Sequence, residues 1–160
     1  MRRDGFPDDL KTEVLYRKSL AIKEKQDDEH GVALIYHQLG IIAQEQCDFV
    51  AAEQWFKKSL AIKEKQDDEH GAASTFNQLG QLLRLQEDYV SAAAWYMKAL
   101  LIFLRYKDQY RFNLVLENFI GALKAADPET QTLLRQKWQQ AELEQIIPLA
   151  QLEQKFNEDN

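Results

Sequence analysis

The sequence predicts an all-α fold in which helical hairpins repeat along the chain. Only three prolines and six glycines occur in 160 residues, and β-branched residues are sparse, so long stretches of helix-forming residues run uninterrupted. The segment KSLAIKEKQDDEHG at residues 18–31 returns unchanged at residues 58–71, a shift of 40 residues. Tandem identity over this length is typical of repeat proteins, whose units pack on their sequence neighbours.

The repeat extends beyond the identical segment. HQLG at 37–40 corresponds to NQLG at 77–80, and a third, weaker copy follows. This copy keeps Ala92, Trp95, Lys98, Leu100 and Ile102 at the positions of Ala52, Trp55, Lys58, Leu60 and Ile62.

Apolar residues within each unit recur at intervals of three and four, which predicts two helices per unit. The linker at residues 45–48 is so short that the two helices must form an antiparallel hairpin, and Asp48 is a suitable N-cap for the second. Gly40 and Gly80 recur inside the first helices, where glycine costs about 1 kcal/mol relative to alanine. We therefore expect two helix backbones to approach closely at these positions.

Composition and charge exclude several classes of function. The net charge of −6 argues against nucleic-acid binding, which needs a concentrated positive surface. Cys47 is the single cysteine, so the chain has no internal disulfide, and this fits a reducing compartment. No apolar run approaches the roughly 20 residues that span a bilayer, and no secretory signal is visible. We expect a cytoplasmic protein that binds neither nucleic acid nor membrane.

The alternation of large, small and aromatic residues on the paired helices resembles the tetratricopeptide repeat (TPR) pattern. The residues that carry the resemblance are Leu39, Gly40, Ala43, Phe49, Ala52, Phe56 and Ser59, and Leu79, Gly80, Leu83, Tyr89, Ala92, Tyr96 and Ala99. The unit of 40 residues exceeds the familiar length of about 34 and resembles the repeats of kinesin light chain and of bacterial signalling proteins. The resemblance implies an α-solenoid, a right-handed superhelix whose first helices line a concave, protein-binding face.

The expected organisation places an array of helical hairpins between two short ends. Residues 1–7 form an N-terminal extension, and residues 8–126 form the array. Within the array we expect the second helix of a partial repeat, full repeats at about 28–66 and 68–106, and the first helix of a divergent third repeat at 109–126. Residues 127–147 form a C-terminal capping helix with Asp127 as N-cap, and 148–160 form a tail that ends in disorder.

Carried over residue by residue, the resemblance places thirteen residues on the concave face. They are Leu34, His37, Gln38, Ile41, Glu45, Ser74, Asn77, Gln78, Gln81, Arg84, Leu114, Glu117 and Asn118. The two full repeats differ most at these positions, as a scaffold with a tailored binding surface would, although drift at solvent-exposed positions would give the same pattern. Gln38, Gln78 and Asn118 form one equivalent row, and side-chain amides offer both a donor and an acceptor to a bound peptide backbone.

Chemistry at a metal or catalytic site is not expected. The loops Asp27–His30 and Asp67–His70 contain acidic residues and a histidine, but consecutive residues at a turn rarely converge on one ion, and helix capping explains the aspartates. No phosphate-binding loop or nucleophile motif occurs, so we predict no enzyme, no cofactor and no metal.

The leading hypothesis is a scaffold that binds a peptide or protein segment, whose identity the sequence does not give. Two alternatives remain open. One is a self-assembly module that forms a homo-oligomer through its ends or its capping helix. The other is the sensor part of a larger bacterial signalling NTPase or caspase-like peptidase. Trp138 on the capping helix could seal the last hairpin or contact a partner subunit.

Overall fold

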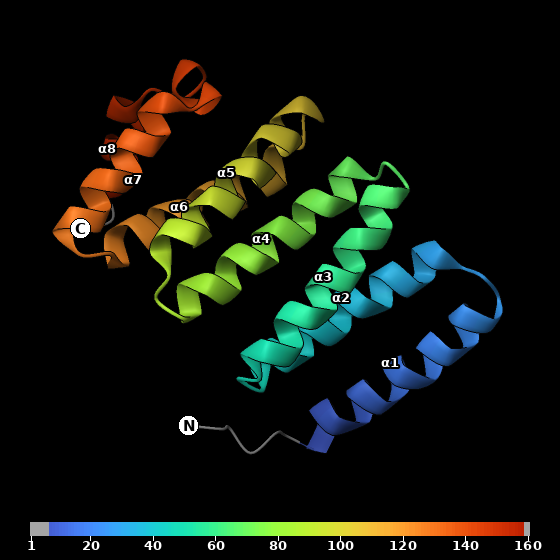
Figure 1. Cartoon of the computed structure of the whole chain (residues 1–160). Helices are drawn as coiled ribbons and strands as arrows, with labels where there is room; N and C mark the ends of the chain where they lie inside the picture. The colour runs from blue at the N-terminus through green and yellow to red at the C-terminus, as the bar shows by residue number, and fades with distance from the viewer. Residues whose placement is uncertain (1–6, 159–160) are drawn as a thin grey trace. The chain divides into compact units, whose positions relative to one another are not determined.

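The computed structural model describes residues 7–158, and all its regular elements are helical (Figure 1). The helices are α1 (Pro7–Lys25), α2 (Glu29–Glu45), α3 (Phe49–Lys65), α4 (Glu69–Leu85), α5 (Tyr89–Arg105), α6 (Gln109–Ala125), α7 (Pro128–Gln140), the short 3-10 helix η1 (Glu142–Gln145) and α8 (Leu149–Glu158). Helices α2 to α6 each contain 17 residues and are separated by three, so half of each repeat spans 20 residues.

The turns that separate α1 to α6 share one backbone conformation. The middle residue of each turn is left-handed, with φ between 51° and 62°, and none of the five is glycine; they are Asp27, Cys47, Asp67, Glu87 and Lys107. Left-handed backbone costs an L-residue about 1–2 kcal/mol, so each turn must compensate for that strain.

The compensation comes from hydrogen bonds that satisfy the last carbonyls of the preceding helix and the first N–H groups of the following one. In the turn between α2 and α3, the N–H of Cys47 donates to the Gln44 carbonyl at 3.0 Å and that of Asp48 to the Ala43 carbonyl at 2.9 Å. This pattern satisfies the last carbonyls of the preceding helix. The Asp48 carboxylate then accepts from the N–H of Ala51 at 3.1 Å, as expected for the predicted N-cap. Aspartates cap α2, α4, α5 and α6 in the same way.

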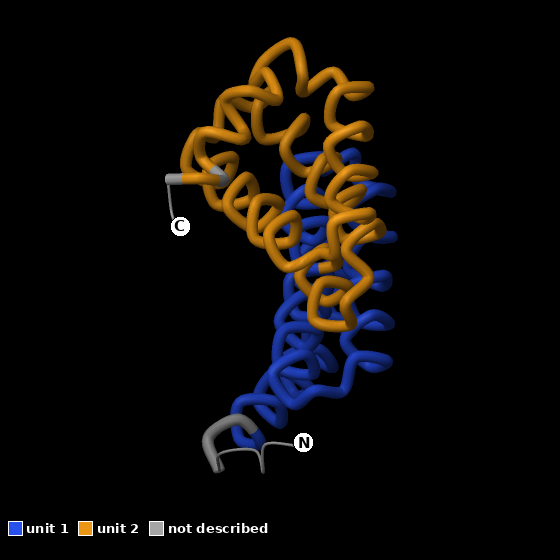
Figure 2. The backbone as a smooth tube through the Cα atoms, turned by 90° about the vertical axis from the view of Figure 1, so that its left-hand side faces the viewer, with its two compact units in different colours: residues 1–78 blue, residues 79–160 orange. Residues whose placement is uncertain are grey.

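The chain divides into two compact units, residues 1–78 and 79–160 (Figure 2). In unit 1, α1 packs on α2 and α2 on α3, around a core that includes Ala33, Leu39 and Phe56. In unit 2, α5 packs on α6, and α7 contacts both, around Tyr96, Phe103 and Phe119. Consecutive helices pack as antiparallel pairs within each unit, so the fold is the all-α helical solenoid that the sequence predicts.

The recurrent glycines make room for aromatic rings. A Cβ atom at Gly40 would lie 2.5 Å from the ring of Phe56, and one at Gly80 would lie 2.5 Å from the ring of Tyr96. Both rings are fully buried. The expectation that two helix backbones approach closely at these glycines is therefore wrong, because the space beside each glycine is filled by an aromatic side chain of the following helix.

The C-terminal region differs from the expectation in two places. Helix α7 begins at the predicted cap Asp127 but ends at Gln140, because the backbone becomes extended at Ala141. Residues 149–158, assigned to a tail, form a helix: Leu152 is fully buried, Arg135 Nε donates to the Glu153 carboxylate at 2.9 Å, and the Glu144 carboxylate accepts from the N–H of Leu149 at 3.0 Å. These contacts join α8 to α7 and η1. The last two residues of the tail lie outside the described residues.

Trp138 packs in the core of the C-terminal region. Its side chain is fully buried, lies 4.8 Å from Phe119 between ring centroids, and donates from Nε1 to the Ile147 carbonyl at 2.9 Å. Of the two roles that the sequence left open, the buried indole fits the seal over the last hairpin.

We predict that Cys47→Gly stabilises the protein by about 0.5–1 kcal/mol, because glycine adopts φ of 60° without steric strain, although it also gains entropy in the unfolded chain. Urea unfolding measures the change. Gln46→Gly is the matched control: Gln46 has φ of −77°, so glycine there should lower stability. A loss of stability in Cys47→Gly would contradict the assignment of strain to this turn.

We predict that Gly80→Ala lowers the free energy of unfolding by about 1–3 kcal/mol, because its methyl group overlaps the buried ring of Tyr96. Gly121→Ala is the matched control, since its Cβ would meet only the end of the Arg84 side chain, at 3.1 Å, and alanine favours the helix. Thermal unfolding distinguishes the two variants, and equal melting temperatures would refute the packing argument.

Candidate functional site

The predicted binding residues of unit 1 come from α2 and from the first half of α4. Leu34 is 49% exposed, and Gln38, Ile41, Ser74 and Gln78 are half-buried, so these side chains remain accessible on the surface. Glu45 is exposed at the end of α2. Apolar and amide groups therefore lie together on the accessible surface of this unit.

His37 and Asn77 are placed differently from their neighbours in the predicted set. Asn77 is only 6% exposed, and His37 packs against the Phe56 ring, 5.7 Å between centroids. The Nδ1 atom of His37 lies 3.3 Å from Thr75 Oγ1, and Lys63 Nζ donates to the same oxygen at 2.9 Å. These two predicted residues thus belong mainly to the packing between helices.

Burial and the nearby Lys63 together keep His37 neutral. The ammonium group of Lys63, only 3% exposed, also donates to the Gly71 carbonyl at 3.2 Å, and burial lowers its pKa. An ammonium group can only donate, so Thr75 accepts from Lys63 and its own proton is available to Nδ1 of His37. Burial, and next the charge of Lys63, lower the pKa of His37 to about 4. His37 is therefore neutral at pH 7.

The predicted residues of unit 2 come from the second half of α4 and from α6. Leu114 is 43% exposed, Glu117 is exposed, and Gln81, Arg84 and Asn118 are half-buried. Arg84 extends toward α6, where its Nη1 lies 3.1 Å from the position that a Cβ of Gly121 would take. Burial raises the pKa of the neighbouring Tyr96 to about 12, so Tyr96 is neutral beside this guanidinium.

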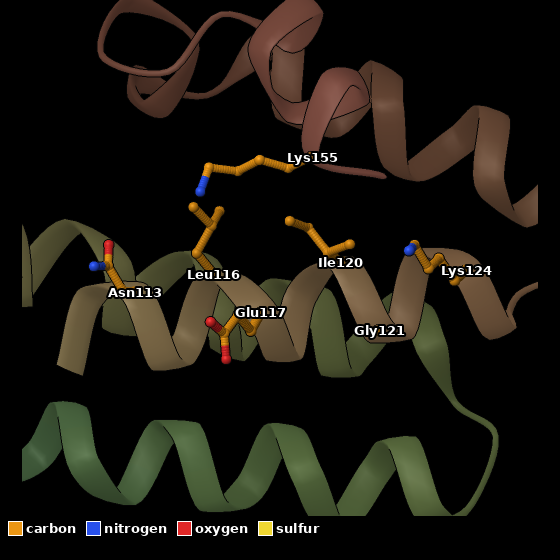
Figure 3. A pocket seen from close by; sticks show the side chains of 7 residues that line it. All are labelled: Asn113, Leu116, Glu117, Ile120, Gly121, Lys124 and Lys155. Atoms are coloured by element: carbon orange, nitrogen blue, oxygen red, sulfur yellow. The ribbon is translucent and has the colours of Figure 1, made fainter. Parts of the chain in front are cut away.

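A pocket of about 330 Å³ lies beside this surface, between α6 and α8 (Figure 3). Leu116 and Ile120 point from α6 into it, and Lys155 reaches over Leu116 from α8. Its remaining lining residues are Asn113, Glu117, Gly121 and Lys124. The Lys155 ammonium group above this apolar floor suits an apolar ligand group that carries negative charge.

Only Glu117 of the predicted set lines this pocket. Asn113, Leu116 and Ile120 were missed because they lie at positions of α6 other than those carried over from the repeat, and Lys155 was missed because residues 148–160 were assigned to a tail. The spacing of Leu149 and Leu152 directly after Pro148 is the signal that could have indicated α8.

The described residues contain neither a metal-binding cluster nor a membrane-spanning helix. Between residues 7 and 158 no group of three histidine, cysteine, aspartate or glutamate side chains could hold a metal ion. No helix in the same part of the chain has the length and apolar character needed to cross a membrane.

Comparison with protein families identifies the class of this protein. The family model described as tetratricopeptide repeat matches residues 10–65 and 31–105, which together make up more than half of the chain. The chain therefore belongs to the tetratricopeptide repeat family. Repeats of this family generally mediate protein–protein interaction or scaffolding, and the fold is typically not catalytic.

A solved structure supports the same fold. The crystal structure of BtubC (BKLC) from P. vanneervenii is similar to this chain with a TM-score of 0.67 and 24% sequence identity. The match covers 74% of this chain and 50% of BtubC, so the present chain spans about half the length of that protein. No curated protein matches the chain.

We predict that acid destabilises the protein through His37. The pKa of His37 is lowered from 6.5 to about 4, so its contribution to stability is complete above pH 6.5 and is lost as the pH falls toward 4, where the unfolded chain binds the proton more tightly. The loss at pH 5 is about 1–2 kcal/mol.

The measurement is urea unfolding at pH 7.5 and pH 5 for the parent and for His37→Asn, which introduces the residue found at the equivalent position 77. The variant should lose less stability between the two pH values than the parent does. Gln38→Asn, on the same helix, is the control and should keep the parental difference. If His37→Asn loses as much stability between pH 7.5 and pH 5 as the parent does, the acid sensitivity belongs to other groups.

Proposed function

We propose that the chain is a scaffold that binds a protein segment on the exposed faces of its first helices, α2, α4 and α6. The observation that carries the proposal is the pairing of exposed apolar side chains with accessible amides on the same helix: Leu34 with Gln38 on α2, and Leu114 with Asn118 on α6. An apolar contact supplies affinity, and an amide can bond the ligand backbone as donor and acceptor.

The repeats retain their packing residues and vary on these faces. Gly40 and Gly80 are the same in both full repeats, whereas the exposed Leu34 corresponds to Ser74, and Ile41 to Gln81. This contrast supports a common scaffold with a surface adapted to one ligand. Helices held by capped turns and buried aromatic rings are ordered before binding, so most of the ordering cost falls on the ligand.

The pocket between α6 and α8 supports a further statement about the ligand. Lys155 lies above the apolar floor of Leu116 and Ile120, on a protein whose net charge is −6. The ligand segment then carries an acidic residue next to an apolar one. A cytoplasmic location and the absence of catalysis remain predictions from the sequence.

The identity of the partner can be found by site-specific photo-crosslinking. A photoreactive residue at Leu34 or at Leu114 should capture the same protein from a lysate of the source organism, whereas one at Val50, which is 70% exposed on α3, should not. Capture at all three positions alike, or at none, would count against binding by the first helices.

We predict that Gln78→Ala combined with Asn118→Ala weakens binding of the captured partner about tenfold, because two amide hydrogen bonds to the ligand are lost. Isothermal titration calorimetry measures the affinity, and the melting temperature should change little. Gln54→Ala, on the exposed surface of α3, is the control. An unchanged affinity would reject the amide row.

A further inference from the structure

Helices α1 and α3 share a sequence but not an environment. Residues 18–25 and 58–65 are identical, yet Ser19 is exposed whereas its equivalent Ser59 is fully buried. The same contrast holds for Thr12 against Ala52, which is also fully buried. Lys23 is accessible, whereas the equivalent Lys63 is 3% exposed. One sequence thus provides a buried helix face in α3 and an exposed one in α1.

The cause of the difference between Ser19 and Ser59 is the helix that packs against α3, whereas Lys63 is bonded to residues of α4. Helix α2 lies antiparallel to α3 and covers this face: Ser59 Oγ donates to the Ala33 carbonyl at 2.7 Å, and the ring of Phe56 fills the space beside Gly40. No described helix covers α1 in this way. Helix α1 packs on α2 through the same helix face that α3 uses to pack on α4. The equivalent residues Lys23 and Lys63 mark this face, since Lys23 bonds to Asp28 at the start of α2 and Lys63 bonds to Thr75 on α4.

Small and large side chains alternate along the exposed face of α1. Leu15 is 63% exposed and Ile22 is 55% exposed, and Thr12 and Ser19 lie on the same side of the helix at intervals of three and four. Leu10 and Val14 are exposed on the other side of α1, so Leu15 and Ile22 are the large apolar side chains of this face, and neighbouring exposed apolar side chains are typical of an interaction surface.

The charges of α1 are divided between its two halves. Residues 8–16 contain Asp8, Asp9 and Glu13 against Lys11, a net charge of −2, whereas residues 17–25 contain four basic residues against Glu24, a net charge of +3. An antiparallel copy of the same helix would place each acidic half beside a basic half. A parallel copy would place like charges together, which is unfavourable.

We propose that the exposed face of α1, defined by Thr12, Leu15, Ser19 and Ile22, binds the same face of a second copy of this chain, antiparallel and about a two-fold axis. A pairing centred on residue 17 sets Leu15 of each copy against the small Ser19 of the other, and Thr12 against Ile22. The face is therefore complementary to itself in size as well as in charge, which a two-fold interface requires. This assembly goes beyond the proposed binding of a partner, which uses other helices.

Light scattering coupled to size-exclusion chromatography tests the proposal on the whole chain, from about 1 µM to about 500 µM, since a dimer forms by mass action. We expect the mass to rise with concentration from 18.7 kDa to twice that value. Leu15→Glu with Ile22→Glu should remain monomeric throughout, and because both positions are exposed, the circular dichroism spectrum and melting behaviour of the monomer should be retained. Leu10→Glu, at an exposed position on another side of α1, is the matched control and should still dimerise.

A charge exchange distinguishes α1 pairing from any other dimer. Asp9→Lys with Glu13→Lys makes both halves of α1 positive, and Lys18→Glu with Lys25→Glu makes both halves negative, so each variant alone should be monomeric. An equimolar mixture of the two should form a heterodimer. A parent that stays at 18.7 kDa at every concentration, a dimer that survives Leu15→Glu with Ile22→Glu, or a mixture that stays monomeric would overturn the proposal.

Discussion

The three-residue turn with a left-handed centre and an aspartate N-cap is the constraint on which the rest of the structure depends. It ends one helix through its backbone hydrogen bonds and begins the next through the aspartate, so two helices must lie antiparallel at a fixed register. Five such turns, 20 residues apart, join α1 to α6. The register places Phe56 beside Gly40 and Tyr96 beside Gly80, and the aromatic core of each unit follows from it.

The buried polar groups of unit 1 show how the scaffold and its accessible surface are separated. Lys63, Thr75 and His37 satisfy one another inside the helix packing, with His37 neutral, while Leu34 and Gln38 on the same helix α2 remain accessible. Adjacent residues of one helix, such as His37 and Gln38, thus divide between the helix packing and the accessible surface. In unit 2 the same division holds between the buried Phe119 and the half-buried Asn118 of α6.

Much of the fold could be predicted because its signals are local. Hairpins, the caps Asp48 and Asp127 and the tetratricopeptide repeat family could be recognised from helical periodicity, turn residues and a repeat of 40 residues. The candidate site was less accessible to such reasoning. Repeat equivalence assigned His37 and Asn77 to the concave surface, but the exposure of a side chain depends on the helix that packs across from it, and α8 added Lys155 to a pocket that no repeat pattern contains.

The sequence by itself determined the class of the protein, the length of its repeating unit and the capping aspartates Asp48 and Asp127 at which α3 and α7 begin, because capping and helical periodicity act between residues close in the chain. Only the tertiary structure decided which members of identical segments are buried. Ser19 and Ser59 occupy the same position of two identical segments. Ser59 is buried because α2 covers α3, whereas Ser19 is exposed. Burial is a property of packed pairs of helices, and a single segment cannot specify its neighbour.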